Sequence, residues 1–417
     1  MFVGITNTPR DYAWGSTSAI AELTGSQPSG GPEAELWFGA HPLSPSRIVD
    51  PAAVGGHETL DGLIAADPAR ALGAARRSDT LPFLLKLLAA DVPLSLQAHP
   101  SIEQAKEGFA REHAAGIPLD ADARLYKDEL HKPELTLALS DAFEALAGFR
   151  DVAGTRLLLQ ELVDYATASR DEDAELLGEL RDRSLGEPVA ALAHIVQFAL
   201  SGTPTVPRLI EAVVRNAARA PKSSSFLREY ATVGRLAELH PGDPGVLVAL
   251  LLNRVTLTQG QALYLPSGNI HSYQHGLALE IMAASDNVLR GGLTPKHVDG
   301  AELQKVLDFV PVPPPVIRPE EESPGVEVFR PDVPDFLLAR VTVGDAGARD
   351  GYALTGVPEA TWTPPGASIA LALGGAVTIA GAVSTGVLEA GSAAFITADE
   401  GALRFSGSAT VFVASGV

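Results

Sequence analysis

The 417-residue chain contains no cysteine. This absence excludes disulfide bonds, thiolate metal sites and cysteine nucleophiles at once. Any metal site must therefore use imidazole, carboxylate, amide or water ligands. Because the chain has only ten histidines, few such sites are possible.

Positive charge is also scarce. The chain has 31 Lys and Arg residues but 51 Asp and Glu residues, which gives a formal net charge of −20. So acidic a surface repels nucleic acids and anionic membranes, and we expect neither as a partner. An enzyme of this charge that binds a phosphorylated metabolite needs a local cluster of Lys and Arg in its cleft. Solubility explains the acidic excess as a whole.

Long hydrophobic runs are absent as well. The longest, Val246–Leu252 and Leu81–Leu88, are far too short to span a bilayer. The first residues lack the basic segment and apolar stretch of a signal peptide. We therefore expect a cytoplasmic protein, and the 46% hydrophobic and 20% charged composition is that of an ordinary globular chain.

A chain of this length is too long for one hydrophobic core and predicts two or three domains. Helical spacing of Leu, Ala, Arg and Glu dominates residues 152–239. Short strand-like runs lie before and after this stretch, so residues 81–139 and 245–282 are expected to fold together across it. Beyond a proline-rich linker at Val310–Pro319, regularly spaced β-runs return.

These patterns predict a mainly β protein with a helical insertion. The expected division is a split catalytic β-barrel domain (1–151 and 240–310), a helical insertion (152–239) and a C-terminal β domain (320–417). Specific predictions are helices over His57–Arg77 and from Ser101 toward His113, and strands over Leu81–Leu88, Val92–His99, Val246–Leu252, Ile270–His275 and Gly276–Met282.

Three short segments offer ligand atoms for a cation. Gln97 and His99 share one side of a predicted strand, because residues i and i+2 of a strand face the same way. Glu134 opens a strand after His131-Lys132-Pro133, and a Pro-Ser-Gly-Asn turn delivers His271 to the start of another. Two histidines, a glutamate and a glutamine suit a borderline divalent ion. Six other histidines are expected to be ordinary core or surface residues: His41, His57, His113, His194, His240 and His297.

A fourth segment carries cations. Glu280 lies on a predicted strand that leads through Asp286 to Arg290 and the glycines Gly291 and Gly292. Glycines let a ligand approach the backbone closely, and the planar fork of arginine suits a phosphate or an oxyanion. A surface hairpin with a solvated arginine is the alternative for this segment taken alone.

Together these segments resemble the signature of type I phosphomannose isomerases. The matching runs are QAHP (97–100), HKPE (131–134), PSGNIHSY (266–273) and SDNVLRGGLTPKHVD (285–299), with PRDYAWGS (9–16), AELWFGAHP (34–42) and LPFLLK (81–86). The resemblance covers residues 1–150 and 245–300. It implies cupin-type jelly-roll barrels, one zinc ion per chain, a sugar phosphate as substrate and a monomer.

The resemblance also implies the roles of individual residues. It implies that zinc is held by Gln97, His99, Glu134 and His271. Catalytic residues would be Arg290, Lys132, Asp286, His131 and Glu280, and substrate-binding residues would be Lys296, Ser95, Lys86 and Trp14. An aldose–ketose isomerase moves a proton between C1 and C2 and stabilises an enediolate. We expect Arg290 on the enediolate oxygens, Lys132 and Asp286 sharing proton transfer, and His131 assisting ring opening.

Two alternatives use the same kind of barrel. A non-catalytic sugar-binding cupin explains the β pattern but not the basic cluster beside the ligand set. An Fe(II) oxygenase uses two histidines and one carboxylate and leaves positions open for oxygen, whereas Gln97 offers a fourth protein ligand here.

Overall fold

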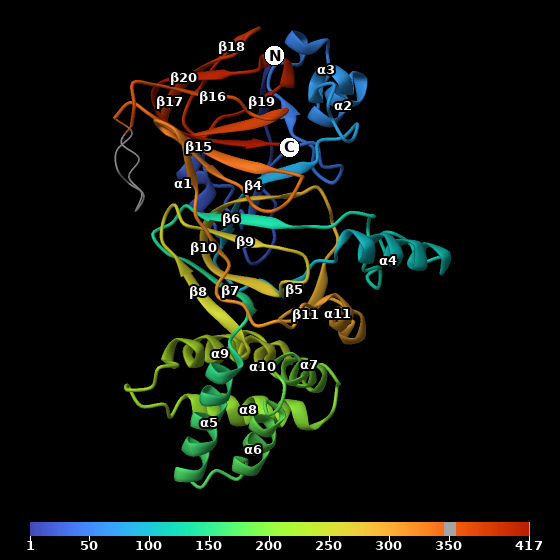
Figure 1. Ribbon diagram of the computed structural model, residues 1–417, viewed down its shortest axis with the longest axis vertical. Coiled ribbons are helices and arrows are strands. Elements are labelled where there is room, and N and C mark those ends of the chain that lie inside the picture. Colours follow the sequence, from blue (N-terminus) through green and yellow to red (C-terminus); the bar gives the residue numbers. More distant parts are fainter. Residues whose placement is uncertain (346–355, 417) are drawn as a thin grey trace.

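The computed structural model describes residues 1–345 and 356–416. Figure 1 shows an elongated molecule in which a helical layer occupies one end, a C-terminal sheet the other, and a second sheet lies between them. Both termini lie near the C-terminal sheet. Among the described residues, no helix has the length and apolar character needed to cross a membrane.

The middle layer is an antiparallel sheet drawn from both sides of the helical insertion. Its strands are β2 (Glu35–Phe38), β4 (Phe83–Ala90), β5 (Leu96–Ala98), β6 (Glu134–Ala138), β7 (Phe143–Phe149), β8 (Leu252–Leu257), β9 (Ala262–Leu265), β10 (His271–Ala283), β11 (Leu289–Gly292) and β12 (Val316–Ile317). The prediction that residues 81–139 and 245–282 fold together is confirmed, because β10 pairs with β4 and β6.

Strand β10 organises this sheet. Its first half, from His271, pairs with β5 and β7, and its second half, from Gly276, pairs with β4 and β6. Gly276 lies at the change of partners with a φ of 118°, and a Cβ there would lie 2.7 Å from the carbonyl oxygen of Ala142. Glycine is therefore required at this bend.

The C-terminal sheet takes up strands from the start of the chain. It contains β13 (Glu320–Ser323), β14 (Val326–Phe329), β15 (Leu337–Val343), β16 (Glu359–Trp362), β17 (Ser368–Ala380), β18 (Thr385–Leu388), β19 (Ala393–Ile396) and β20 (Leu403–Ser415), together with β1 (Phe2–Thr6) and β3 (Arg47–Ile48). Strand β1 pairs with β19, a partnership that the sequence division did not include.

One group of helices forms the insertion, and the other helices lie in the connections between strands. The insertion contains α5 (Val152–Ala168), α6 (Ala174–Arg183), α7 (Pro188–Ala199), α8 (Thr205–Ala217), α9 (Leu227–Leu239) and α10 (Gly245–Ala249). The others are α1 (Ala19–Thr24), α2 (Leu60–Ala66), α3 (Pro68–Leu72), α4 (Ile102–Ala114) and α11 (Gly300–Val306), with short 3₁₀ turns η1 (Pro51–Val54) and η2 (Ala398–Glu400).

Two large cores join the layers. One core packs the outer face of β4, β6 and β10 against the C-terminal sheet through residues such as Leu87, Leu279 and Phe412. The other core packs the helical insertion against β5 and β11 through Leu96 and Leu289. The strands that carry Gln97 and Arg290 therefore pack against the helices of the insertion.

Three local predictions were wrong in extent or type. The helix predicted over His57–Arg77 is split into α2 and α3, because Pro68 cannot continue α2 and instead begins α3. The run Val246–Leu252 was predicted as a strand, but α10 covers most of it, since a short fully buried apolar run does not reveal its period. The strand predicted over Val92–His99 is regular only at β5; before it Val92 donates to Trp14 and Leu94 donates to Tyr273, and Pro93 between them has no N–H to donate.

Candidate active site

Two histidines and one glutamate meet inside the middle sheet. His99 follows β5, Glu134 begins β6 and His271 begins β10. The Nε2 atom of His99 lies 3.3 Å from Oε1 of Glu134, and that of His271 lies 3.2 Å from Oε2. The three side chains are at most 2% exposed, and their ligand atoms lie within 4.8 Å of one another. A single cation can contact all three.

Backbone carbonyls determine which ring nitrogens face this cluster. Nδ1 of His99 lies 2.7 Å from the carbonyl oxygen of Asn287, and Nδ1 of His271 lies 3.0 Å from that of Asn269. Because a carbonyl oxygen only accepts, each Nδ1 carries the proton and each Nε2 presents a lone pair. Both Nε2 atoms are buried and have no hydrogen-bond partner in residues 1–345 and 356–416. Such a pair of nitrogens beside a carboxylate fits a divalent cation.

Gln97 lies on the same face. Its Cα pairs with His271 across one strand boundary and with Arg290 across the other. Directly opposed residues of antiparallel strands point to the same side of the sheet. The register therefore supports the amide of Gln97 as a fourth ligand and puts Arg290 beside the cluster.

Protonation in the cluster also suits a metal ion. Burial lowers the pKa of His99 to about 4, so its imidazole is neutral near pH 7. Burial alone would raise the pKa of Glu134, but the ammonium of Lys132, together with the two imidazoles when they are protonated, holds that pKa well below its usual value. Neutral imidazoles and an ionised carboxylate are the forms that bind divalent cations.

A buried ion pair lies next to the cluster of His99, Glu134 and His271. Nζ of Lys86 is 3.1 Å from Oε2 of Glu280 and 3.9 Å from Oε1 of Glu35. The hydroxyl of Tyr273 lies 2.9 Å from Glu280 and 3.3 Å from Glu134, and so links the ion pair to the cluster. Burial alone would lower the pKa of Lys86, but Glu35 and Glu280 raise it and keep the ammonium charged. Lys86 is thus bound to Glu280 in the interior, and burial raises the pKa of Glu280 itself.

Arg290 and Lys296 supply positive charge without an acidic partner. Arg290 is half-buried, and no carboxylate in the described residues forms an ion pair with it or with Lys296. Burial lowers the pKa of both groups, and the charge of Arg290 lowers that of Lys296 further. In a protein of net charge −20, the half-buried Arg290 is a candidate contact for an anion, with the exposed Lys296 and its distant neighbour Asp122 in the same region.

Asp286 lies on the approach to this region with its side chain 33% exposed. Its backbone N–H donates to Asp128 at 2.8 Å, and Nε2 of the buried His41 lies 3.4 Å from its carboxylate. Nδ1 of His41 accepts from the N–H of Leu43 at 3.3 Å, so the Nε2–H of His41 faces Asp286. The sequence predicts His41 to be an ordinary histidine, and only its place in the matching run 34–42 indicates otherwise.

His131 and Lys132 are held by acids from different parts of the chain. Nε2 of His131 lies 2.8 Å from Oδ2 of Asp335, which comes from the segment between β14 and β15. Nζ of Lys132 lies 3.3 Å from Oε1 of Glu134. Asp335 carried no sequence signal, since it is 204 residues from its partner. The C-terminal segment thus contributes a residue next to the site.

The remaining two predicted residues, Trp14 and Ser95, are partly buried. Trp14 stacks on Tyr12, with ring centroids 5.8 Å apart, and packs against the hydrophobic cluster that includes Leu88 and Tyr273. Ser95 directly precedes β5, two residues before Gln97. Both positions remain predictions as substrate contacts.

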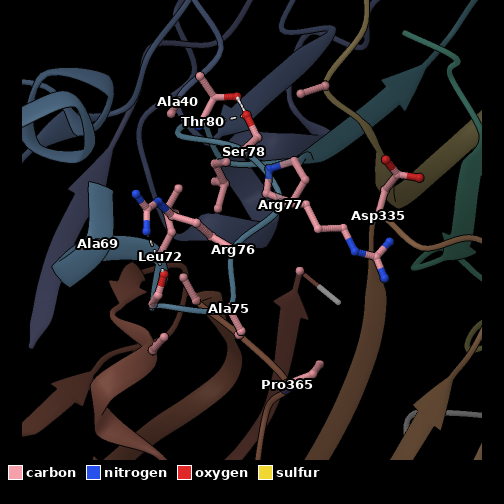
Figure 2. Close-up of a pocket in the computed structure, with 18 of the residues that line it drawn as sticks. Ala40, Ala69, Leu72, Ala75, Arg76, Arg77, Ser78, Thr80, Asp335 and Pro365 are labelled. Carbon is pink, nitrogen blue, oxygen red and sulfur yellow. Dashed lines mark hydrogen bonds between the residues drawn. The ribbon is translucent and has the colours of Figure 1, made fainter. Parts of the chain in front are cut away.

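A cavity of about 840 Å³ adjoins the site. His41 and Asp335 belong to its wall, whereas His99, Glu134, His271 and Arg290 do not, so the cavity lies beside the cluster and not over it. Figure 2 shows Arg77 extending on the side where Asp335 lies, while Arg76 points the other way, toward Ala69 and Leu72. Residues of α3 and of the C-terminal sheet both line the cavity.

Residues 2–152 match the family described as phosphomannose isomerase type I, catalytic domain. The mannose-6-phosphate isomerase of Escherichia coli K12 is 36% identical over 412 residues, which cover 96% of each chain. The human mannose-6-phosphate isomerase is 31% identical over 356 residues, or 80% of each chain.

Solved structures agree over the full length. A zinc-bound crystal structure of mannose 6-phosphate isomerase has a TM-score of 0.84 and 33% identity, covering all of this chain and 99% of the other. The apo form of the enzyme from Salmonella typhimurium also has a TM-score of 0.84, with 32% identity and the same coverage. This chain therefore belongs to the type I phosphomannose isomerase family.

Proposed function

We propose that this protein is a zinc-dependent isomerase that interconverts mannose 6-phosphate and fructose 6-phosphate. The observation that carries the proposal is the buried His99–Glu134–His271 cluster with the unpaired Arg290 on the same face, in a chain that belongs throughout to this family. A metal centre beside an uncompensated cation suits a phosphorylated sugar that becomes more negative as it reacts.

The donor atoms fit zinc. Two Nε2 lone pairs, one carboxylate and the amide of Gln97 make a set of four N/O ligands, and one ion per chain is expected. When bound, the ion adds positive charge that polarises sugar oxygens. Lys132, within 3.3 Å of Glu134, adds a further cation at the same place.

The chain's own residues divide the remaining work. Arg290 is placed to stabilise the enediolate, because its guanidinium has no acidic partner in the described residues and lies on the ligand face. We assign proton transfer to Asp286, with Lys132, since Asp286 is partly exposed and is oriented by His41. His131, held by Asp335, would assist ring opening. Glu280 is bound to Lys86 in the interior, so its role would be to organise Tyr273 and Glu134 and not to carry the proton.

The finer architecture belongs to the same proposal. Antiparallel strands around a buried polar centre support a cupin-type jelly-roll for the middle sheet. The division at 151, 240 and 320, the monomeric state and the cytoplasmic location remain predictions.

A coupled assay with mannose 6-phosphate on metal-replete protein tests the function. We expect turnover that a strong chelator abolishes and added Zn²⁺ restores, together with about one zinc per chain. Iron in place of zinc would favour the oxygenase alternative. Turnover that persists in fully demetallated protein would contradict the ligand set, and sugar binding without turnover would favour the non-catalytic cupin.

A further inference from the structure

Asp243 connects the end of the helical insertion to the segment that carries the unpaired cations. Its Oδ1 accepts hydrogen bonds from the N–H of Gly245 at 2.7 Å and from the N–H of Leu293 at 2.9 Å. Its Oδ2 accepts a longer one from Thr294 at 3.4 Å. One carboxylate therefore holds two segments that are about fifty positions apart in the chain.

The backbone at Gly245 and the backbone at Gly292 approach each other so closely that both positions need glycine. A Cβ on Gly292, whose φ is 120°, would lie 2.5 Å from Oδ1 of Asp243 and 2.7 Å from Cα of Gly245. A Cβ on Gly245 would lie 2.9 Å from the backbone nitrogen of Leu293. Side chains at either position would displace the carboxylate or the turn.

The turn held by Asp243 is one that the chain would not adopt by preference. Leu293 is buried and has a φ of 57°, in the left-handed region that leucine rarely occupies. Such a conformation persists only when its surroundings hold it. Here the carboxylate of Asp243 binds the N–H groups of Leu293 and of the following residue.

The held turn lies midway between the two cations. Arg290 is three residues before Leu293 and Lys296 three residues after it, and the charge of Arg290 acts on Lys296. The backbone N–H of Lys296 donates to Oγ1 of Thr294 at 3.1 Å, so the order of the turn extends to Lys296. On the other side of the turn, Gly291 packs against Leu303 of α11.

We propose that Asp243 is a positioning residue for the reaction: it fixes the Gly292–Thr294 turn and thereby sets Arg290 and Lys296 against the bound sugar phosphate. This inference rests on the proposed function. It also gives the helical insertion a part in catalysis, because Asp243 lies between α9 and α10. Asp243 acts through the turn, because its carboxylate accepts from the backbone N–H groups of Gly245, Leu293 and Thr294.

The test compares Asp243→Ala and Asp243→Asn with Asp151→Ala. Asp151 is a matched control, because its carboxylate also accepts from a backbone N–H, that of Gly154 at 3.0 Å, at the start of α5. All variants are assayed with mannose 6-phosphate well below their melting temperatures, with zinc content and Tm measured on the same samples.

Asp243→Ala should lower kcat/KM by about a hundredfold, the size of loss expected when catalytic groups shift by roughly an ångström. Both kcat and KM should change, since Arg290 and Lys296 move together, while zinc content stays at the wild-type level. Asp243→Asn should recover much but not all of the loss, because its amide oxygen can still accept from Leu293 and Gly245 whereas its NH2 group cannot accept from Thr294. Asp151→Ala should lower Tm but keep wild-type kcat/KM.

The outcomes separate the two proposals. Wild-type protein that does not turn over mannose 6-phosphate would refute the proposed function, and this inference would fall with it. Active wild-type protein with an equally active Asp243→Ala variant would refute the positioning role alone, as would loss of zinc from that variant. If Asp243→Ala does not fold, Asp243→Asn decides: a several-fold loss in kcat/KM with zinc retained supports the inference, and wild-type kinetics overturn it.

Discussion

At the scale of single residues, the site depends on atoms that have been left without partners. Each of His99 and His271 has its Nδ1 bound to a carbonyl oxygen and its Nε2 uncommitted and buried. A buried polar atom without a partner costs free energy, so its retention indicates a ligand that restores the lost interaction. The half-buried guanidinium of Arg290 forms no ion pair in the described residues, so it can bind an anion at a smaller cost in lost hydration than an exposed arginine.

Removal of one ligand should release the metal ion. His271→Ala and Glu134→Ala each delete one of the three clustered donors, and each should lose most of its zinc, as measured by elemental analysis of the purified protein. His113→Ala is the control, because His113 lies on α4 stacked on Phe109 and away from the cluster. Equal loss of zinc in all three variants would contradict the assignment of the ligands.

Arg290 should act mainly on the transition state. If its guanidinium stabilises charge that appears only as the enediolate forms, Arg290→Ala should lower kcat by roughly a hundredfold or more, with a smaller change in KM. Zinc content and Tm should remain near wild type, since Arg290 forms no ion pair with an acid in the described residues. Arg290→Lys should recover only part of the activity, because a point charge does not reproduce a two-pronged contact.

An increase in KM alone for Arg290→Ala would instead indicate that Arg290 binds the phosphate. Stabilisation of the enediolate would then be assigned to Lys132. A variant that unfolds or sheds its metal would make Arg290 structural.

The sequence predicted the site residues that lie in its motifs and missed those that come from elsewhere. His99, Glu134 and His271 were predicted as ligands, and the structure brings them together. Asp335 and Asp243 reach the site across 204 and about fifty positions of chain, and a lone aspartate in a loop has no pattern that reveals its partner. Lys86 was expected near the phosphate, but it lies opposite Glu280 in the pairing of β4 with β10, and the sequence does not reveal which strands pair or in what register.

At the scale of elements, periodicity predicted the helices better than the strand boundaries. The capped helix from Ser101 toward His113 is α4, with both hydrogen bonds of the capping box present. The two strands predicted at Ile270–His275 and Gly276–Met282 are one strand, β10. The predicted boundary falls at Gly276, which is the bend at which β10 changes partners.

Gly276→Ala tests the importance of that bend. A Cβ at Gly276 would meet the carbonyl oxygen of Ala142 at 2.7 Å on a backbone with φ of 118°, so the variant combines a clash with strain. We expect a loss of about 2 kcal/mol in the free energy of unfolding, measured from urea midpoints. Activity should fall as well, because the bend sets His271 relative to Glu280.

Gly374→Ala is the matched control for strain without a clash. Its φ is 74°, but a Cβ there would meet no atom within 4 Å. The control should lose less stability and keep full activity. Equal losses of stability in Gly276→Ala and Gly374→Ala would show that the close approach to Ala142 does not contribute to the effect.

At the scale of the whole molecule, the two ends of the chain are joined in one sheet. Strand β1 pairs with both β19 and β3, so the first residues complete the C-terminal sheet. The apolar core between that sheet and the middle sheet then extends beneath β4, β6 and β10. Stability of the C-terminal sheet should therefore support the strands that carry the site.

Glu400 makes the attachment of the first residues to the C-terminal sheet sensitive to pH. Its carboxylate is buried and accepts from the N–H groups of Val383 at 2.9 Å and Ser384 at 3.0 Å, and it forms an ion pair with the amine of Met1. Burial alone would raise the pKa of Glu400, but the Met1 amine, Ser384 and Val383 lower it from an ordinary value of 4.5 to about 2. Because the folded-state pKa is depressed, the stabilisation is complete above pH 4.5 and is lost as pH falls from there toward 2.

Glu400→Gln should therefore have a lower Tm than wild type at pH 7, and the difference should stay constant down to about pH 5. Below pH 4.5 the two melting temperatures should converge, because protonation of the wild-type carboxyl removes the charge that the variant already lacks. Glu389→Gln is the control for loss of a surface charge, since Glu389 is exposed in the segment between β18 and β19, and its Tm should follow wild type at every pH. Calorimetric scans at pH 7, 5, 4 and 3.5 would measure both differences. A gap between wild type and Glu400→Gln that does not narrow at the two lowest pH values would mean that Glu400 stabilises the sheet by packing and not by its charge.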